Sequence, residues 1–161
     1  MKWPIGMEPE NVPVYARNEI VIAAPPPTVW RWLCRAELWP SWYSNCSAMT
    51  IDSPPGHHEL ESGTEFTWKT FGAQIHSRVL VFEPNRELGW DAHGILTAYH
   101  GWTLESEDSG CRVITEETQR GFVPTIARWY LRGMLVRGHQ TWVEELKRVA
   151  EVGAPPTGEN T

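Results

Sequence analysis

The feature that most constrains this chain is a run of segments with a two-residue hydrophobic period, followed by one long segment with helical spacing. The run predicts β-strands at residues 64–70, 73–83, 87–94, 96–105 and 111–119. Only short turns such as Phe71-Gly72 separate them, which indicates that neighbouring strands pair antiparallel. The helical segment begins near Pro124 and ends at about Glu151, so it is about 40 Å long and able to cross a whole sheet.

One further strand and two short helices precede this run. Residues 14–22 alternate as a strand, and the prolines at 25–27 end it. Proline also opens a helix, because its missing N–H is not needed there, and a helix is predicted through Cys34. A second helical turn is predicted at 39–43 and a loop at 52–63. We expect an α+β fold, in which a curved antiparallel sheet of about six to seven strands wraps around the long C-terminal helix.

The length of 161 residues suits a single domain with loose ends. Residues 1–13 carry prolines without periodicity and are predicted to form an arm. Residues 14–151 form the domain, and the Pro- and Gly-rich residues 152–161 are expected to form a flexible tail. Hydrophobic residues make up 41% and charged residues 21%, a composition typical of globular proteins rather than disordered ones.

The charge pattern argues against several kinds of partner. Twenty acidic and fourteen basic residues give a formal net charge of −6, and the basic residues are scattered along the sequence. Nucleic acids and anionic membranes bind clustered Lys and Arg, so neither is expected as a partner. No apolar run approaches the ~18 residues that span a bilayer, so stable membrane insertion is not expected either.

The cysteines and the N-terminus favour a cytoplasmic protein. The first residues lack the apolar stretch of a signal peptide, and the three cysteines match no disulfide or zinc pattern, which predicts reduced thiols. The sequence His57-His58-Glu59 lies in a loop without a third ligand at usable spacing. We therefore predict no metal site.

Ten residues are Trp, against four Phe and four Tyr. A buried indole N–H needs a partner, and Leu or Phe would fill a core more simply. The excess of Trp predicts walls around a flat, apolar molecule. The alternative is a core that is merely rich in Trp.

The alternation of the last two predicted strands brings a histidine and a glutamate onto the concave face of the sheet. The less polar faces contain His100 and Trp102 in one strand, and Thr115 and Glu117 in the other. A four-residue turn at 107–110 places Trp102 opposite Thr115 and His100 opposite Glu117. Directly opposed side chains lie about 5 Å apart at Cβ, close enough for a His–carboxylate hydrogen bond.

Two interpretations of this pair remain open. A carboxylate beside an imidazole fixes its tautomer and raises its basicity, so the pair could move a proton on a carbonyl-rich substrate, as aldol cyclisation and dehydration require. Alternatively, His100 and Glu117 simply satisfy each other's hydrogen bonds in the interior.

Other strands are assigned to the concave face in the same way. Trp68 and Trp90 point inward in their strands. The parity of residues 73–83 is ambiguous, and we favour Ile75, Val79 and Val81 as the inward residues, with His76 outside.

The long helix is predicted to close the cavity with one arc of its surface, which contains Ala127, Tyr130, Leu131, Met134, Gly138 and Trp142. Gly138 makes room for a ligand or for close packing on a strand. Away from this arc we expect Arg128, Arg132 and His139. A second apolar line, expected to pack under the short helices rather than in a dimer contact, contains Trp129, Val136 and Val143.

Several motifs resemble one known superfamily. The sequence IVIAAPPPTVW at 20–30, followed by WPSW at 39–42, resembles the opening of the START-like, helix-grip (SRPBCC) superfamily, and is most similar to its polyketide cyclase/dehydrase and lipid-transport branch. FEPNRELGW at 82–90 resembles that branch's central hairpin. HGWTL at 100–104 with GCRVITEE at 110–117 resembles its last hairpin. The resemblance implies the helix-grip fold, but this superfamily includes cyclases, carriers, receptors and chaperone activators.

Three functions are therefore compared, and whether the protein is an enzyme stays open. The first is a cofactor-independent cyclase or dehydratase with His100 and Glu117 as the acid–base pair. The second is a non-catalytic carrier or sensor of a lipid, quinone or aromatic metabolite, and the third is a partner-binding module resembling chaperone activators. The expected ligand is a hydrophobic small molecule, and the protein is expected to be a monomer or weak homodimer. The predicted ligand-binding residues are Trp42, Trp68, Trp90, Trp102, Thr115, Tyr130, Met134 and Gly138.

Overall fold

The computed structural model describes residues 1–54, 56–94 and 96–156. They contain a seven-stranded sheet in the order β1-β7-β6-β5-β4-β3-β2, in which all neighbours pair antiparallel. The strands are β1 (Val14–Ile22), β2 (Cys46–Ser53), β3 (Glu65–Thr70), β4 (Ala73–Glu83), β5 (Glu87–His93), β6 (Thr97–Glu107) and β7 (Gly110–Arg120).

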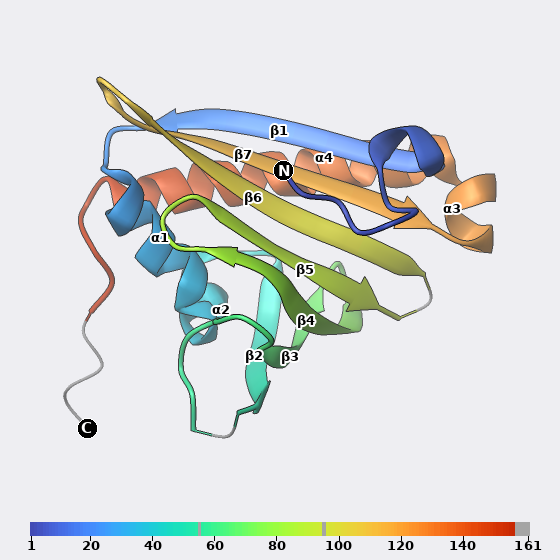
Figure 1. The fold of residues 1–161 in the computed structure, drawn as a ribbon, viewed down its shortest axis with the longest axis horizontal. Coiled ribbons are helices and arrows are strands. Elements are labelled where there is room, and N and C mark those ends of the chain that lie inside the picture. Colours follow the sequence, from blue (N-terminus) through green and yellow to red (C-terminus); the bar gives the residue numbers. More distant parts are fainter. Residues whose placement is uncertain (55, 95, 157–161) are drawn as a thin grey trace.

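One long helix, α4 (Arg128–Ala150), lies along one face of this sheet (Figure 1). The shorter helices are η1 (Pro9–Asn11), α1 (Pro26–Cys34), η2 (Ala36–Leu38), α2 (Trp39–Trp42) and α3 (Phe122–Ile126). Helix α1 begins at the proline cluster, where the missing N–H groups cost nothing. The predicted α+β helix-grip fold, with two short α-helices after the first strand, is confirmed.

Two elements differ from the sequence prediction. Strand β2 was not predicted, because its pairing with β3 is interrupted by register shifts that break the two-residue hydrophobic period. The predicted C-terminal helix is split in two at Ala127, whose φ of −108° and ψ of 19° interrupt the helix between α3 and α4.

A bulge in β4 explains the ambiguous parity of that strand. Ile75 and Val79 face the core as predicted, but the pairing with β5 shifts between Val79 and Val81. Beyond the shift it is Phe82 that packs inward, against Trp30 at a ring-centroid distance of 5.3 Å. The inward assignment of Val81 was therefore wrong, because one extra residue exchanges the two faces of a strand.

The N-terminal arm packs across the face of the sheet opposite α4 (Figure 1). The Trp3 ring lies 5.5 Å from Tyr99, and the Met1 side chain occupies the space above Gly101, where a Cβ would clash with it. The backbone N–H of Lys2 donates to Glu87 at 2.5 Å. The arm therefore buries Tyr99 on a face that otherwise points to solvent.

The core beside α1 and α2 is built from aromatic rings that pack mostly edge to face. Trp39 is fully buried and contacts Phe66, Trp68, Trp90 and Trp142 at centroid distances of 5.3–6.0 Å. The Trp39 indole donates to the carbonyl of Leu33 at 3.1 Å. We call these aromatic residues, together with Tyr43, the indole core.

The start of the C-terminal tail is attached to α1. The Trp32 indole donates to the carbonyl of Gly153, and Arg35 donates to the carbonyl of Pro156. The rest of the predicted flexible tail, 157–161, lies outside the described residues. Within the described residues, none of the helices combines the length and the apolar character needed to cross a membrane.

Candidate functional site

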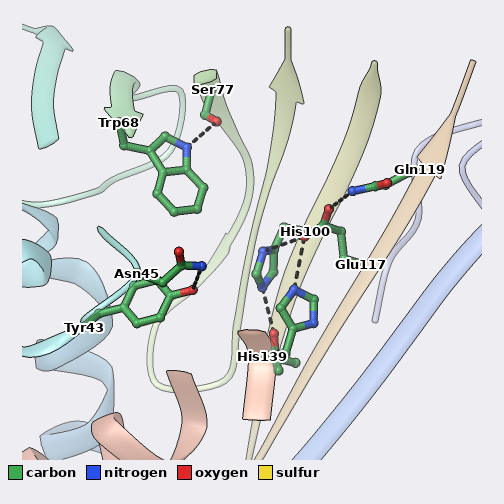
Figure 2. Close-up of polar contacts among 9 residues, drawn as sticks. Tyr43, Asn45, Trp68, Ser77, His100, Glu117, Gln119 and His139 are labelled. Atoms are coloured by element: carbon green, nitrogen blue, oxygen red, sulfur yellow. Dashed lines mark hydrogen bonds and ion pairs between the residues drawn. The ribbon is translucent and has the colours of Figure 1, made fainter. Parts of the chain in front are cut away.

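A polar cluster occupies the concave face where β6, β7 and α4 meet. Strands β6 and β7 pair in the predicted register, with His100 opposite Glu117 and Trp102 opposite Thr115. The Nδ1 atom of His100 lies 3.3 Å from Oε2 of Glu117 (Figure 2). Its Nε2 lies 2.7 Å from the hydroxyl of Thr115. A donor at Nδ1 and an acceptor at Nε2 satisfy both contacts, which fixes one neutral tautomer.

A second histidine completes this cluster. His139 of α4 is 1% exposed, and its Nε2 lies 3.1 Å from the same Glu117 oxygen (Figure 2). The other oxygen of Glu117 accepts a hydrogen bond from the Gln119 side chain at 2.7 Å. Glu117 is therefore held by side chains from β6, β7 and α4. We call His100, Thr115, Glu117, Gln119 and His139 the polar cluster.

The outward orientation predicted for His139 was wrong. The side of α4 that packs on the sheet does not include Tyr130, and its buried residues are Leu131, Leu135, His139, Trp142, Val143, Leu146 and Ala150. These positions repeat at intervals of three and four residues, so the signal is present in the sequence. It was missed because the predicted arc shares Leu131 and Trp142 with this line but was centred about a quarter turn away, on Tyr130 and Met134.

Burial and hydrogen bonding set the charges in the polar cluster. Burial lowers the pKa of His100 to about 4, and the neighbouring Glu117 carboxylate opposes this only in part. Burial alone would raise the pKa of Glu117, but the hydrogen bonds from His100 and His139 outweigh it and hold this pKa well below its usual value. At neutral pH the cluster contains a neutral His100 beside an ionised carboxylate.

A cavity of about 660 Å³ opens beside the polar cluster. Its buried end is lined by Trp90, Trp142 and the polar cluster residues His100, Glu117, Gln119 and His139. At its outer end lie exposed residues of the β3–β4 turn and of the segment after β5, including Phe71, Gly72 and Gly94. The cavity therefore runs from solvent to the His–Glu contact.

The predicted site residues fall into three groups. Trp68, Trp90, Met134, His100 and Glu117 line the cavity. Trp102 and Thr115 lie behind it, where the Trp102 ring stacks on His100 at 5.4 Å and Thr115 binds the same imidazole.

The remaining three predicted residues are not brought to the cavity. Trp42 packs against Trp32 in the core, and Gly138 lies under the ring of Phe71 beside a separate shallow groove. Tyr130 is 70% exposed, because it lies on the side of α4 that faces away from the buried residues of this helix. For Tyr130 in particular, the structure contradicts the predicted place in the cavity wall.

The same cluster contains a set of residues that could hold a divalent metal ion. One donor atom each from His100, Glu117 and His139 lies within 4.8 Å of the other two. Two imidazoles and one carboxylate are a common ligand set for zinc and iron. The loop histidine His58, by contrast, lies at the surface against Glu37.

A curved antiparallel sheet that grips one long helix and leaves a cavity between them defines the class of helix-grip proteins that bind hydrophobic small molecules. The sequence model of the polyketide cyclase/dehydrase and lipid transport family matches residues 14–151. The chain belongs to this family, as its motifs predicted. No curated protein matches the chain.

Solved structures agree with this fold. The hypothetical protein jhp0584 from Helicobacter pylori is 25% identical, with a TM-score of 0.85 over 93% of this chain and 95% of that one. The di-domain ARO/CYC StfQ from the steffimycin biosynthetic pathway is 15% identical, with a TM-score of 0.73 over 86% of this chain and 51% of that one. TTHA0849 from Thermus thermophilus is 15% identical, with a TM-score of 0.69 over 86% of this chain and 97% of that one. At 15% sequence identity, the similarity to StfQ and TTHA0849 shows a shared fold and nothing more.

Proposed function

We propose that the protein binds a flat, apolar molecule with carbonyl or hydroxyl groups in its cavity, and that His100 and Glu117 move a proton on this molecule. The reaction class is the cofactor-independent aldol cyclisation or dehydration of a polyketide-like or aromatic substrate. One observation carries the proposal: a neutral imidazole in contact with an ionised carboxylate lies at the buried end of an indole-lined cavity of about 660 Å³.

The cavity walls suit such a ligand. The Trp68, Trp90 and Trp142 rings present flat apolar surface, whereas the polar groups gather at the buried end. A ligand would therefore place its apolar body among the indoles and its oxygens near the polar cluster.

The proton transfer would depend on the imidazole. His100 is the base, and it exchanges its Nε2 contact with Thr115 for the acidic C–H beside the ligand's carbonyl. Glu117 accepts from Nδ1 and stabilises the positive charge that forms on the ring, as carboxylate partners of catalytic histidines do. His139 and Gln119 act as positioning residues, because they fix both oxygens of Glu117. In a dehydration the protonated imidazole gives this proton to the departing hydroxyl, which leaves as water. In an aldol cyclisation the enolate carbon attacks a second carbonyl of the same ligand, and the proton goes to the alkoxide that forms.

A non-catalytic carrier or sensor of the same ligand is the second candidate, because the cavity alone would serve it. A partner-binding module is less well supported, since it needs no cavity of this size. The ARO/CYC relative StfQ adds support for the cyclase by analogy, although its sequence is only 15% identical.

The test uses β-tetralone, a flat aromatic ketone with acidic protons beside its carbonyl. Quenching of intrinsic Trp fluorescence measures binding of the probe. NMR of hydrogen–deuterium exchange in D₂O measures proton abstraction from it. The wild-type chain should accelerate the exchange over buffer. His100→Ala should lower the rate by about 100-fold or more while the dissociation constant changes little.

His93→Ala serves as the matched control, because His93 is an exposed histidine beside a surface aspartate, Asp91. This variant should catalyse hydrogen–deuterium exchange on β-tetralone at the wild-type rate. Binding without accelerated exchange would overturn the catalytic proposal and favour the carrier. A further outcome would overturn the proton-transfer mechanism as written. In it, the accelerated hydrogen–deuterium exchange is lost after dialysis against a chelator and is restored by a metal ion.

A further inference from the structure

One corner of the molecule exposes an unusual amount of apolar surface. Phe122 and Ile126 of α3 are 79% and 67% exposed, and Trp129 and Tyr130 of α4 are 74% and 70% exposed. These residues lie within a stretch of nine, in and between α3 and the start of α4, at one corner of the fold (Figure 1). We call them, with Arg128 and Arg132, the corner patch. Large aromatic side chains gathered at the surface mark an interaction site rather than ordinary surface.

The charge around this corner is opposite to that of the whole chain. Residues 120–143 include four arginines and no Asp or Glu, in a chain with a net charge of −6. Arg120, Arg128, Arg132 and Arg137 are all exposed, and the Arg128 guanidinium lies 5.4 Å over the Trp129 ring. Residues 120–143 are therefore a locally basic segment, and the nearby acidic residues are Glu8 and Glu10 of the arm, which contacts Arg120 at Gly6.

The corner patch adjoins the outer end of the cavity on two sides. Arg120, just before α3, pairs with Thr97, whose neighbour Leu96 lines the cavity. On α4, Met134 lines the cavity one helical turn after Tyr130. A surface that covers the patch would therefore lie beside the cavity opening.

An anionic lipid surface fits this combination better than a second copy of the chain. Trp and Tyr rings favour the bilayer interface, Phe and Ile favour the acyl region, and arginines bind anionic headgroups. In a symmetric dimer built on the same patch, both surfaces would carry the same positive charge, which opposes association.

We propose that the corner patch docks the protein on an anionic lipid surface, with the cavity opening beside the bilayer. An apolar ligand then passes between the membrane and the cavity without crossing water. This last step rests on the proposed ligand binding, whereas the docking itself does not.

The test is co-sedimentation of the full chain with lipid vesicles. Vesicles of phosphatidylcholine with about 30 mol% phosphatidylglycerol should bind it, and phosphatidylcholine alone should not. Raising the salt from about 0.1 M to about 0.5 M should release it, because surface charges are then screened. Trp129→Ser should weaken the partition about tenfold and Arg128→Gln a few-fold.

Two exposed residues far from the patch provide matched controls. Val152→Ser removes a 90% exposed apolar side chain beyond the other end of α4, and Arg86→Gln removes an exposed arginine in the β4–β5 turn. Both should bind vesicles like the wild type. Trp129→Ser should still bind β-tetralone in the absence of vesicles, which separates failed docking from failed ligand binding.

Three outcomes would overturn the proposal. They are no binding to the anionic vesicles, binding that the patch variants do not change, and a stable dimer in light scattering that Trp129→Ser converts to a monomer.

Discussion

The concave face of the sheet has two ends, one filled with rings and one left hollow. Beside α1 and α2 the indole core packs Trp39 and Trp142 edge to face, at 5.3 Å, and stacks Tyr43 on Trp142 at 4.2 Å. Toward the opposite end the same strands border the cavity and the polar cluster. Residues such as Trp90 and Trp142 belong to both, since they contact the core and line the cavity.

The difference shows how one sheet divides stability and chemistry between its ends. Rings in contact gain dispersion and hydrophobic free energy, whereas a cavity forfeits those contacts and buried polar groups carry a desolvation cost. The indole core therefore offsets the cost of the hollow end. Substitutions at the two ends should then affect different quantities.

The largest expected effect on stability is at the centre of the indole core. Trp39→Ala removes a fully buried ring, its aromatic contacts and its hydrogen bond to Leu33, so the free energy of unfolding should fall by about 4–5 kcal/mol. Urea denaturation followed by circular dichroism measures it. Trp129→Ala, at an exposed indole, should change the same quantity by less than about 0.5 kcal/mol. Equal losses would show that the core is not where stability is concentrated.

The next effect is a pH dependence that comes from the hollow end. In the unfolded chain His100 binds a proton below about pH 6.5, whereas in the folded chain it stays neutral down to about pH 4. The unfolded state therefore binds more protons in this window, and falling pH favours it. The free energy of unfolding should drop by up to about 3 kcal/mol between pH 6.5 and pH 4.

Urea midpoints measured across this window test the dependence. His100→Gln should flatten the curve, because the titrating group is gone, whereas the exposed control His93→Gln should keep the wild-type slope. Glu117 acts in a lower window: its pKa is depressed in the folded chain, so its contribution is lost only at more acidic pH. A slope that persists in His100→Gln would contradict this assignment.

Regular and irregular parts of the chain differ in how far the sequence predicts them. Strand pairing follows from alternation and turn length, and it placed His100 opposite Glu117 correctly. The short turn fixes the register of that hairpin, and each inward position follows from the parity of its neighbours. Local rules of this kind are enough where the ladder is regular.

Irregular positions were not predicted, because their cause is not local. The side of α4 that packs on the sheet is set by tertiary contacts, which bury His139 and expose Tyr130. The bulge after Val79 exchanged Val81 and Phe82, because one extra residue reverses every later assignment on a strand. His139, the third titratable member of the polar cluster, was missed because the amphipathic pattern of α4 alone allowed two inward sides.

Filling the cavity should separate ligand binding from stability. Met134 is half-buried on the cavity wall, and Met134→Trp would place a large ring in the cavity. The free energy of unfolding should change by no more than about 1 kcal/mol, since the ring occupies existing space. The affinity for β-tetralone, measured by Trp fluorescence, should fall at least tenfold. Unchanged affinity would mean that the probe binds elsewhere.

The smallest effect is expected at Gly138, where α4 meets the turn between β3 and β4. A Cβ at this position would overlap the ring of Phe71, which is 37% exposed and can move outward. Gly138→Ala gains up to about 1 kcal/mol of helix propensity but displaces that ring, so the free energy of unfolding should stay within about 1 kcal/mol of wild type.

Because Phe71 also lines the outer end of the cavity, the displaced ring should speed release of β-tetralone in stopped-flow fluorescence. Gly133→Ala, on the same helix but clear of Phe71, gains the propensity alone and should leave the release rate unchanged. Equal release rates in all three proteins would show that Phe71 does not control access, and that the hollow end opens elsewhere along α4.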